Sequence, residues 1–153
     1  MDLMLNAADL TNLSGMQKNA ILQALFLALG IDREVNAEEL AQFEREVASI
    51  PWGIDHALLQ EMVRAARVRR KLVSGAHDTQ VWIREIASYL PSQSVKEKTL
   101  AAMGRIALAQ GINRAERGLL NAFASSLELP ADRLEQIKQA LSPASASPTQ
   151  GAD

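Results

Sequence analysis

The sequence predicts an all-α domain of about seven helices, and three observations support this prediction. Apolar residues recur at steps of three and four along most of the chain, and no stretch alternates apolar and polar residues for long enough to suggest a strand. Four polar residues are followed three positions later by Glu or Gln, which is the spacing of a helix-capping box. Pro51, Pro91 and Pro130 fall between the apolar segments, where proline interrupts no helix.

In the N-terminal half, three helices are expected after a short helical turn over residues 2–10. Their ranges are 15–30, 37–49 and 55–73. Ser14 with Gln17 opens the first, and Asn36 with Glu39 opens the second. In such a pair, the cap side chain accepts from the backbone amide three residues on, and the third residue bonds back to the cap amide. Asp55 is the expected cap of the third helix.

In the C-terminal half, four helices are expected. Their ranges are 79–90, 95–110, 114–128 and 131–141. Ser94 with Glu97 and Asn113 with Glu116 have the spacing of capping boxes at the starts of the second and third of these helices. The last helix follows Pro130, a residue tolerated just outside a helix start.

Length and composition indicate one domain over residues 1–141 and a disordered tail over 142–153, which has no large apolar residue. The absence of cysteine excludes disulfides, thiolate metal ligands and a cysteine nucleophile. The longest apolar stretch, residues 20–29, is too short to cross a membrane, which takes about 20 residues. The N-terminus has no basic flank before its apolar residues, so that we expect a cytoplasmic location.

Two stretches of the sequence, 28–40 and 107–116, resemble each other. Each runs from an Ala/Leu-rich helix through a short loop to a β-branched residue, Val35 or Ile112, and then to an Asn cap with Glu at the third helical position. This repetition predicts two pseudo-symmetric helix–loop–helix halves whose apolar faces need each other for burial.

The repeated stretch is similar to the signature of the TerB-like domain, a small helical domain of tellurite-resistance and related bacterial stress proteins. Four residues match the first family motif in register: Asp32, Val35, Asn36 and Glu39. Arg33 replaces the usual glycine, and in the second copy Gln110 replaces the acid and the loop is one residue shorter. The resemblance covers about residues 16–141. It implies a TerB-like bundle and a non-enzymatic module of stress or tellurite response that acts through protein–protein contacts.

The same resemblance implies a divalent-cation site, because the duplicated acids of that family are candidate metal ligands. The ligand set would be Asp32, Glu34, Glu39 and Glu116. In the alternative that we favour, the same acids only cap and stabilise helix N-termini, because Gln110 replaces the second Asp and Arg33 lies in the loop. We therefore expect no cofactor, or at most a weakly bound divalent cation. An EF-hand is excluded, since Phe43 stands where its bidentate Glu would be.

A basic run over residues 64–71 carries five cations and no acid, whereas residues 32–46 carry six acids and two bases. The candidate partner-binding residues are Arg64, Arg67, Arg70 and Lys71. Arg64, Arg67 and Lys71 share one helical stripe. The simplest interpretation is a solvated helix face. An acidic protein partner of an adaptor or co-chaperone-like module, or an anionic membrane surface, comes next. Nucleic acid comes last, because no aromatic residue is interleaved to stack on bases.

No residues form the pattern of a catalytic site, so we expect a protein that is not an enzyme. His56 and His77 are the only histidines, and neither lies one helical turn from a second metal ligand. There is no nucleophile elbow and no glycine-rich phosphate loop.

Two tryptophans and two glycines are expected to matter for packing. Trp52 and Trp82 are predicted to lie in the core, because large aromatic side chains contribute most there. Gly104 and Gly118 fall inside expected helices, where glycine weakens the helix, so we expect close helix–helix contacts at both.

Overall fold

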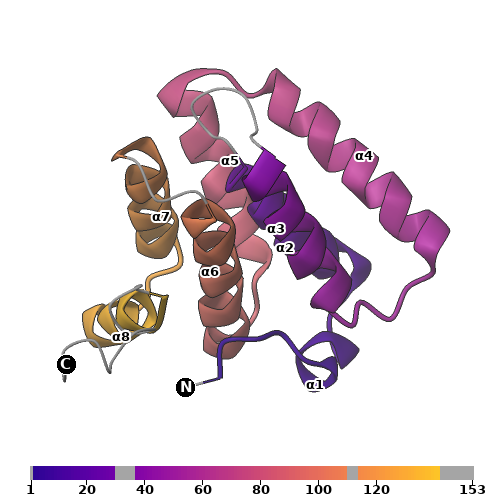
Figure 1. The fold of residues 1–153 in the computed structure, drawn as a ribbon, viewed down its shortest axis with the longest axis horizontal. Helices are drawn as coiled ribbons and strands as arrows, with labels where there is room; N and C mark the ends of the chain where they lie inside the picture. Colours follow the sequence, from indigo (N-terminus) through magenta and orange to yellow (C-terminus); the bar gives the residue numbers. More distant parts are fainter. Residues whose placement is uncertain (1, 30–36, 110–113, 142–153) are drawn as a thin grey trace.

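The computed structural model describes residues 2–29, 37–109 and 114–141, and within these ranges the chain forms eight α-helices and no strand (Figure 1). The helices are α1 (Ala7–Thr11), α2 (Gly15–Leu27), α3 (Ala37–Ser49), α4 (His56–Leu72), α5 (Gly75–Tyr89), α6 (Gln93–Leu108), α7 (Arg114–Ser126) and α8 (Ala131–Leu141). The all-α prediction is confirmed. The two loops that carry the TerB-like motifs and the tail 142–153 lie outside the described residues.

Two helices, α2 and α6, form the centre of the fold and pack against each other. Both are apolar around most of their circumference, which is typical of helices that are covered on all sides. Helices α3, α4 and α5 lie against α2, while α3, α7 and α8 lie against α6. No described helix combines the length and apolar character that a membrane span requires.

Local capping explains where several helices begin. Ser14 and Gln17 form the predicted capping box, and Asp55 accepts a hydrogen bond from the Leu58 amide as predicted. A further capping box, between Asn6 and Asp9, opens α1. This box was not predicted from the sequence.

The predicted start of α6 at a Ser94–Glu97 box is wrong. The cap is Ser92, which accepts from the Val95 amide, and Glu97 is instead buried among tertiary partners. α5 also begins one turn earlier than predicted, at Gly75, whose positive φ of 77° suits glycine. The two remaining predicted boxes involve Asn36 and Asn113, which lie outside the described residues.

Both tryptophans lie in the core, as predicted. Trp52 donates from its indole nitrogen to the Val47 carbonyl oxygen at 3.0 Å. Gly104 makes the expected close approach, because an added Cβ would lie 2.5 Å from Cδ1 of Leu141. The same expectation for Gly118 is wrong, since no other helix among the described residues comes within 4 Å of an added Cβ there.

Candidate functional site

Helix α4 lies along an outer edge of the molecule (Figure 1) and is held from one side only. Its inner side rests on the core through Leu59, Met62, Val63 and Ala66, of which Ala66 alone is fully buried. The opposite side faces solvent along the whole helix. α4 therefore presents a long exposed surface that the fold does not cover.

The basic run of α4 is divided between these two sides. Arg69 turns inward, where it pairs with Glu85 of α5 at 3.1 Å and lies over the Trp82 ring at 5.5 Å from the centroid. Arg70 also turns inward and donates to the carbonyl oxygen of Leu29. Burial lowers the pKa of the Arg70 guanidinium, and the nearby Glu39 carboxylate opposes that shift. The structure thus separates Arg70 from the other three predicted partner-binding residues.

The remaining cations, Arg64, Arg67 and Lys71, are exposed on the outer side, as their shared stripe predicts. Arg64 pairs with Glu61 on the same helix, with both side chains about two-thirds exposed. An exposed pair of this kind contributes about 0–1 kcal/mol, so that it leaves the arginine available to another partner. In the described part of the chain, no ion pair is seen for Arg67 or Lys71.

Large apolar side chains share this outer side with the cations. Leu58 is 49% exposed, Val68 53% and Leu72 73%. The α4 outer face is defined here by eight exposed residues: Leu58, Glu61, Arg64, Ala65, Arg67, Val68, Lys71 and Leu72. The cations of this face were predicted from the sequence, but its apolar residues were not, although their spacing along one helix is a signal for them. Apolar and guanidinium groups together are typical of protein interfaces.

Of the four predicted cation ligands, only Glu39 has a side chain that the structure describes. Glu39 is buried in the first turn of α3. Asp32, Glu34 and the side chain of Glu116 lie outside the described part of the chain. Among the described residues, no three acidic or histidine side chains gather as a metal site would require. The four-residue ligand set therefore stays a prediction.

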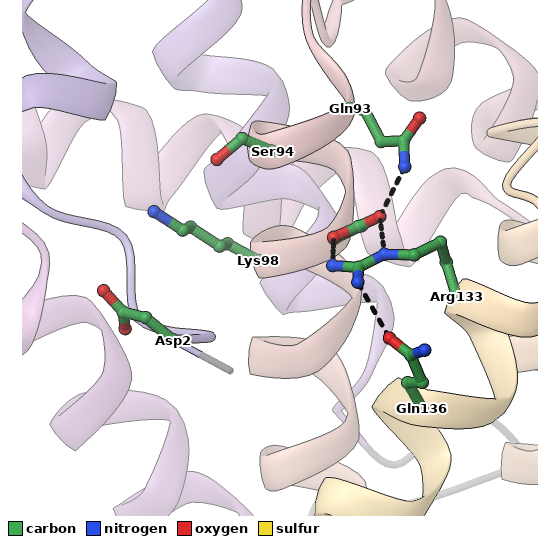
Figure 2. A pocket seen from close by; sticks show the side chains of 7 residues that line it. Asp2, Gln93, Ser94, Lys98, Arg133 and Gln136 are labelled. Carbon is green, nitrogen blue, oxygen red and sulfur yellow. Dashed lines mark hydrogen bonds and ion pairs between the residues drawn. The ribbon is translucent and has the colours of Figure 1, made fainter.

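A polar hollow of about 580 Å³ lies between the N-terminal segment, α6 and α8. Figure 2 shows Arg133 reaching from α8 toward α6, where its guanidinium binds the buried carboxylate of Glu97 at 2.6 and 2.9 Å. Gln93 donates to the same carboxylate at 2.8 Å, and Arg133 also donates to Gln136 at 2.8 Å. These charges satisfy one another, so the network attaches α8 to α6.

On the other side of the hollow, Lys98 binds Asp9 at 2.8 Å and so ties the N-terminal segment to α6. Both side chains are nearly buried. Asp2 and Ser94 also line the hollow, separated from Arg133 in Figure 2. Two acids and two bases line the hollow, so it has no single charge with which to select a ligand.

The hydrogen bonds from Arg133 hold the pKa of the Glu97 carboxyl below its ordinary value, which makes this network pH-dependent. The network should therefore stabilise the fold fully above the unfolded-state pKa of about 4.3, and its contribution should disappear as the pH falls through the lower folded-state pKa. We expect Arg133→Gln to lower the free energy of unfolding near neutral pH, with a gap to the parent protein that narrows in acid. Urea unfolding over a range of pH measures that gap. Lys138→Gln, an exposed change on the same helix, is the control, and a gap of constant size would contradict the assignment.

The α4 outer face is thus the surface with the clearest chemical character in the described structure: exposed cations beside exposed apolar side chains on a helix anchored from behind. Such a surface can bind a partner with acidic and apolar groups. Comparison with known proteins finds no family model, no curated protein and no solved structure that matches this chain.

Proposed function

We propose that this protein is a non-enzymatic helical module that binds an acidic protein partner through the α4 outer face. The observation that carries the proposal is the division of α4 into two sides. Arg69 and Arg70 are used within the fold, whereas Arg64, Arg67 and Lys71 point outward beside Val68 and Leu72. A solvated helix face alone does not account for the large exposed apolar side chains among the cations.

A TerB-like bundle of two related halves, and with it a role in bacterial stress or tellurite response, belongs to this proposal. Two packing relations support it. α2 packs on α3 and on α4, and in the same way α6 packs on α7 and on α8. The halves also differ, because α3 packs on α6 and α2 packs on α5, whereas α7 packs on α5. A weakly bound divalent cation at the predicted acids remains part of the proposed family relation.

Charge reversal of the α4 outer face tests the proposed function. We expect Arg64→Glu/Arg67→Glu/Lys71→Glu to reduce recovery of the native partner by about tenfold or more, since cations at an interface would then oppose the acids they bind. The measurement is affinity purification after chemical cross-linking in cells that make the protein naturally, quantified by mass spectrometry against the parent protein.

The matched control reverses three exposed cations elsewhere: Arg84→Glu, Arg117→Glu and Lys138→Glu. It makes the same change in net charge and should leave recovery of the partner unchanged. An equal loss of partner recovery in both triple variants would show that the effect comes from net charge and not from the α4 outer face. No loss of recovery in either variant would contradict the proposed function. Recovery of membrane lipid in place of protein would favour the anionic membrane surface.

A further inference from the structure

The apolar residues of the α4 outer face repeat at the spacing of a coiled-coil seam. Leu58, Ala65 and Leu72 lie seven residues apart, and Val68 lies three after Ala65. In heptad notation, Leu58, Ala65 and Leu72 occupy the a positions. Glu61 and Val68 occupy the d positions. All five are exposed, so the entire seam faces solvent.

Cations stand beside this seam at regular positions. Arg64 and Lys71 are seven residues apart, and each immediately precedes an a position, which makes both of them g residues. In paired helices, charges at the e and g positions choose the partner by meeting opposite charges across the seam. The α4 outer face therefore combines a narrow apolar seam with a cationic edge.

The core side of α4 leaves this seam free for a partner. The residues at the e positions, Met62 and Arg69, are partly buried, and Arg69 is held by Glu85 and Trp82. Ala65 lies at the middle of the seam, where a small side chain permits close approach of a second helix. Over the 15 residues from Leu58 to Leu72 the seam is about 21 Å long, enough for about four turns of a partner helix.

We infer that the α4 outer face is a docking site for one amphipathic helix of a partner protein, with an apolar stripe bordered by acidic residues. This inference rests on the proposed function and specifies its partner. The apolar stripe packs along Leu58, Ala65, Val68 and Leu72, and the acids meet Arg64 and Lys71. The contact is intermolecular and parallel or antiparallel to α4, with helix axes near the small crossing angle of heptad packing.

Charge complementarity argues against a second copy of α4 as the occupant. Two α4 helices packed antiparallel would bring their g positions together, so that Arg64 and Lys71 of one copy would face the same cations of the other. Packed parallel, these g cations would face Met62 and Arg69, which carry no negative charge. An anionic membrane fits this face less well, because a helix that lies on a membrane buries a broad apolar face, whereas the apolar seam of α4 is narrow and interrupted by Glu61.

Two designed peptides test the inference on the full-length protein. Each is a fluorescein-labelled helix of about 18 residues with Leu at its a and d positions. One carries Glu at e and g, and the other carries Lys there. In fluorescence anisotropy titrations, the Glu peptide should bind the parent protein at least about tenfold more tightly than the Lys peptide.

Two variants of exposed residues distinguish docking from general attraction. Val68→Ser/Leu72→Ser should weaken binding of the Glu peptide by about tenfold or more while leaving the urea unfolding midpoint unchanged, because both side chains are already solvated. Arg64→Glu/Lys71→Glu should reverse the preference in favour of the Lys peptide. That reversal is a gain of binding, and the same charge reversal at Arg84 and Lys138, away from α4, should not produce it.

Several results would overturn the inference. These are equal affinity for both peptides, no binding of either, or binding of the Glu peptide that persists in the serine variant. Sedimentation showing a dimer lost in the serine variant would identify a second copy as the occupant. Phosphatidylserine vesicles that bind where the Glu peptide does not would identify a membrane. If recovery of the native partner depends on the outer-face cations but the Glu peptide fails to bind, the inference is wrong and the proposed function stands. If recovery of the native partner does not depend on these cations, the proposed function itself is wrong.

Discussion

Replacing Trp82 with alanine is expected to lower the free energy of unfolding by about 3–5 kcal/mol, the range typical of large aromatic deletions in a core. Trp82 is 1% exposed, and its indole nitrogen donates to the side-chain oxygen of Gln23 at 2.7 Å. Removing the indole leaves a cavity and an unpaired amide oxygen, and it takes away the surface on which Arg69 rests. Urea unfolding followed by far-ultraviolet circular dichroism measures the change.

Trp82→Phe separates the two contributions. It keeps an aromatic ring in the core but removes the donor to Gln23, so that its cost should be clearly smaller than that of alanine. A loss below about 1 kcal/mol for Trp82→Ala would show that the side chain is not packed as described, since surface changes cost that little.

Replacing Arg105 with alanine is also expected to cost about 3–5 kcal/mol, because it leaves a buried carboxylate without its charged partner. Arg105 of α6 donates to both carboxylate oxygens of Glu46 of α3, at 2.7 and 3.0 Å. It also donates to the carbonyl oxygen of Leu3 at 3.3 Å. The Glu46 side chain is only 5% exposed, and Gln42, which donates to Oε2 at 2.7 Å, would remain as an uncharged donor to it. Urea unfolding of the parent and variant proteins gives the difference.

The double variant Arg105→Met/Glu46→Met is the control for this interpretation. Replacing both charges by apolar side chains of similar size is often neutral, because the cost of burying ions disappears with the ions. The double variant should therefore recover most of the stability lost in Arg105→Ala. If the double variant is as unstable as the single one, the loss comes from packing and not from an unpaired charge.

Helix positions could be predicted from the sequence because the signals are local. The box of Ser14 and Gln17 and the cap at Asp55 depend on neighbours within one helical turn, and both are confirmed. The Ser94–Glu97 spacing failed because Glu97 is bound by Arg133, 36 residues away along the chain. A carboxylate with a tertiary partner cannot be distinguished from a capping residue by spacing alone.

The candidate site could be predicted only in part, because α4 has apolar residues on two sides. Leu59, Met62 and Ala66 repeat at helical spacing, and so do Leu58 and Val68 on the outer side. Either set alone could have faced the core, so the sequence did not determine which cations would point outward. The packing of α4 on α2 determines which side of α4 faces the core. Because of this packing, Arg69 and Arg70 make bonds within the fold.

The one-sided attachment of α4 has a consequence for local opening of the fold. With Ala66 as its single fully buried residue, α4 depends on half-buried contacts and on the polar bonds of Arg69 and Arg70. Elements held in this way open locally at lower cost than the whole domain unfolds. A helix bound along the outer face of α4 requires α4 to be helical, so it would have to be released before α4 could unfold. Occupancy of that face would thereby slow backbone amide exchange in α4.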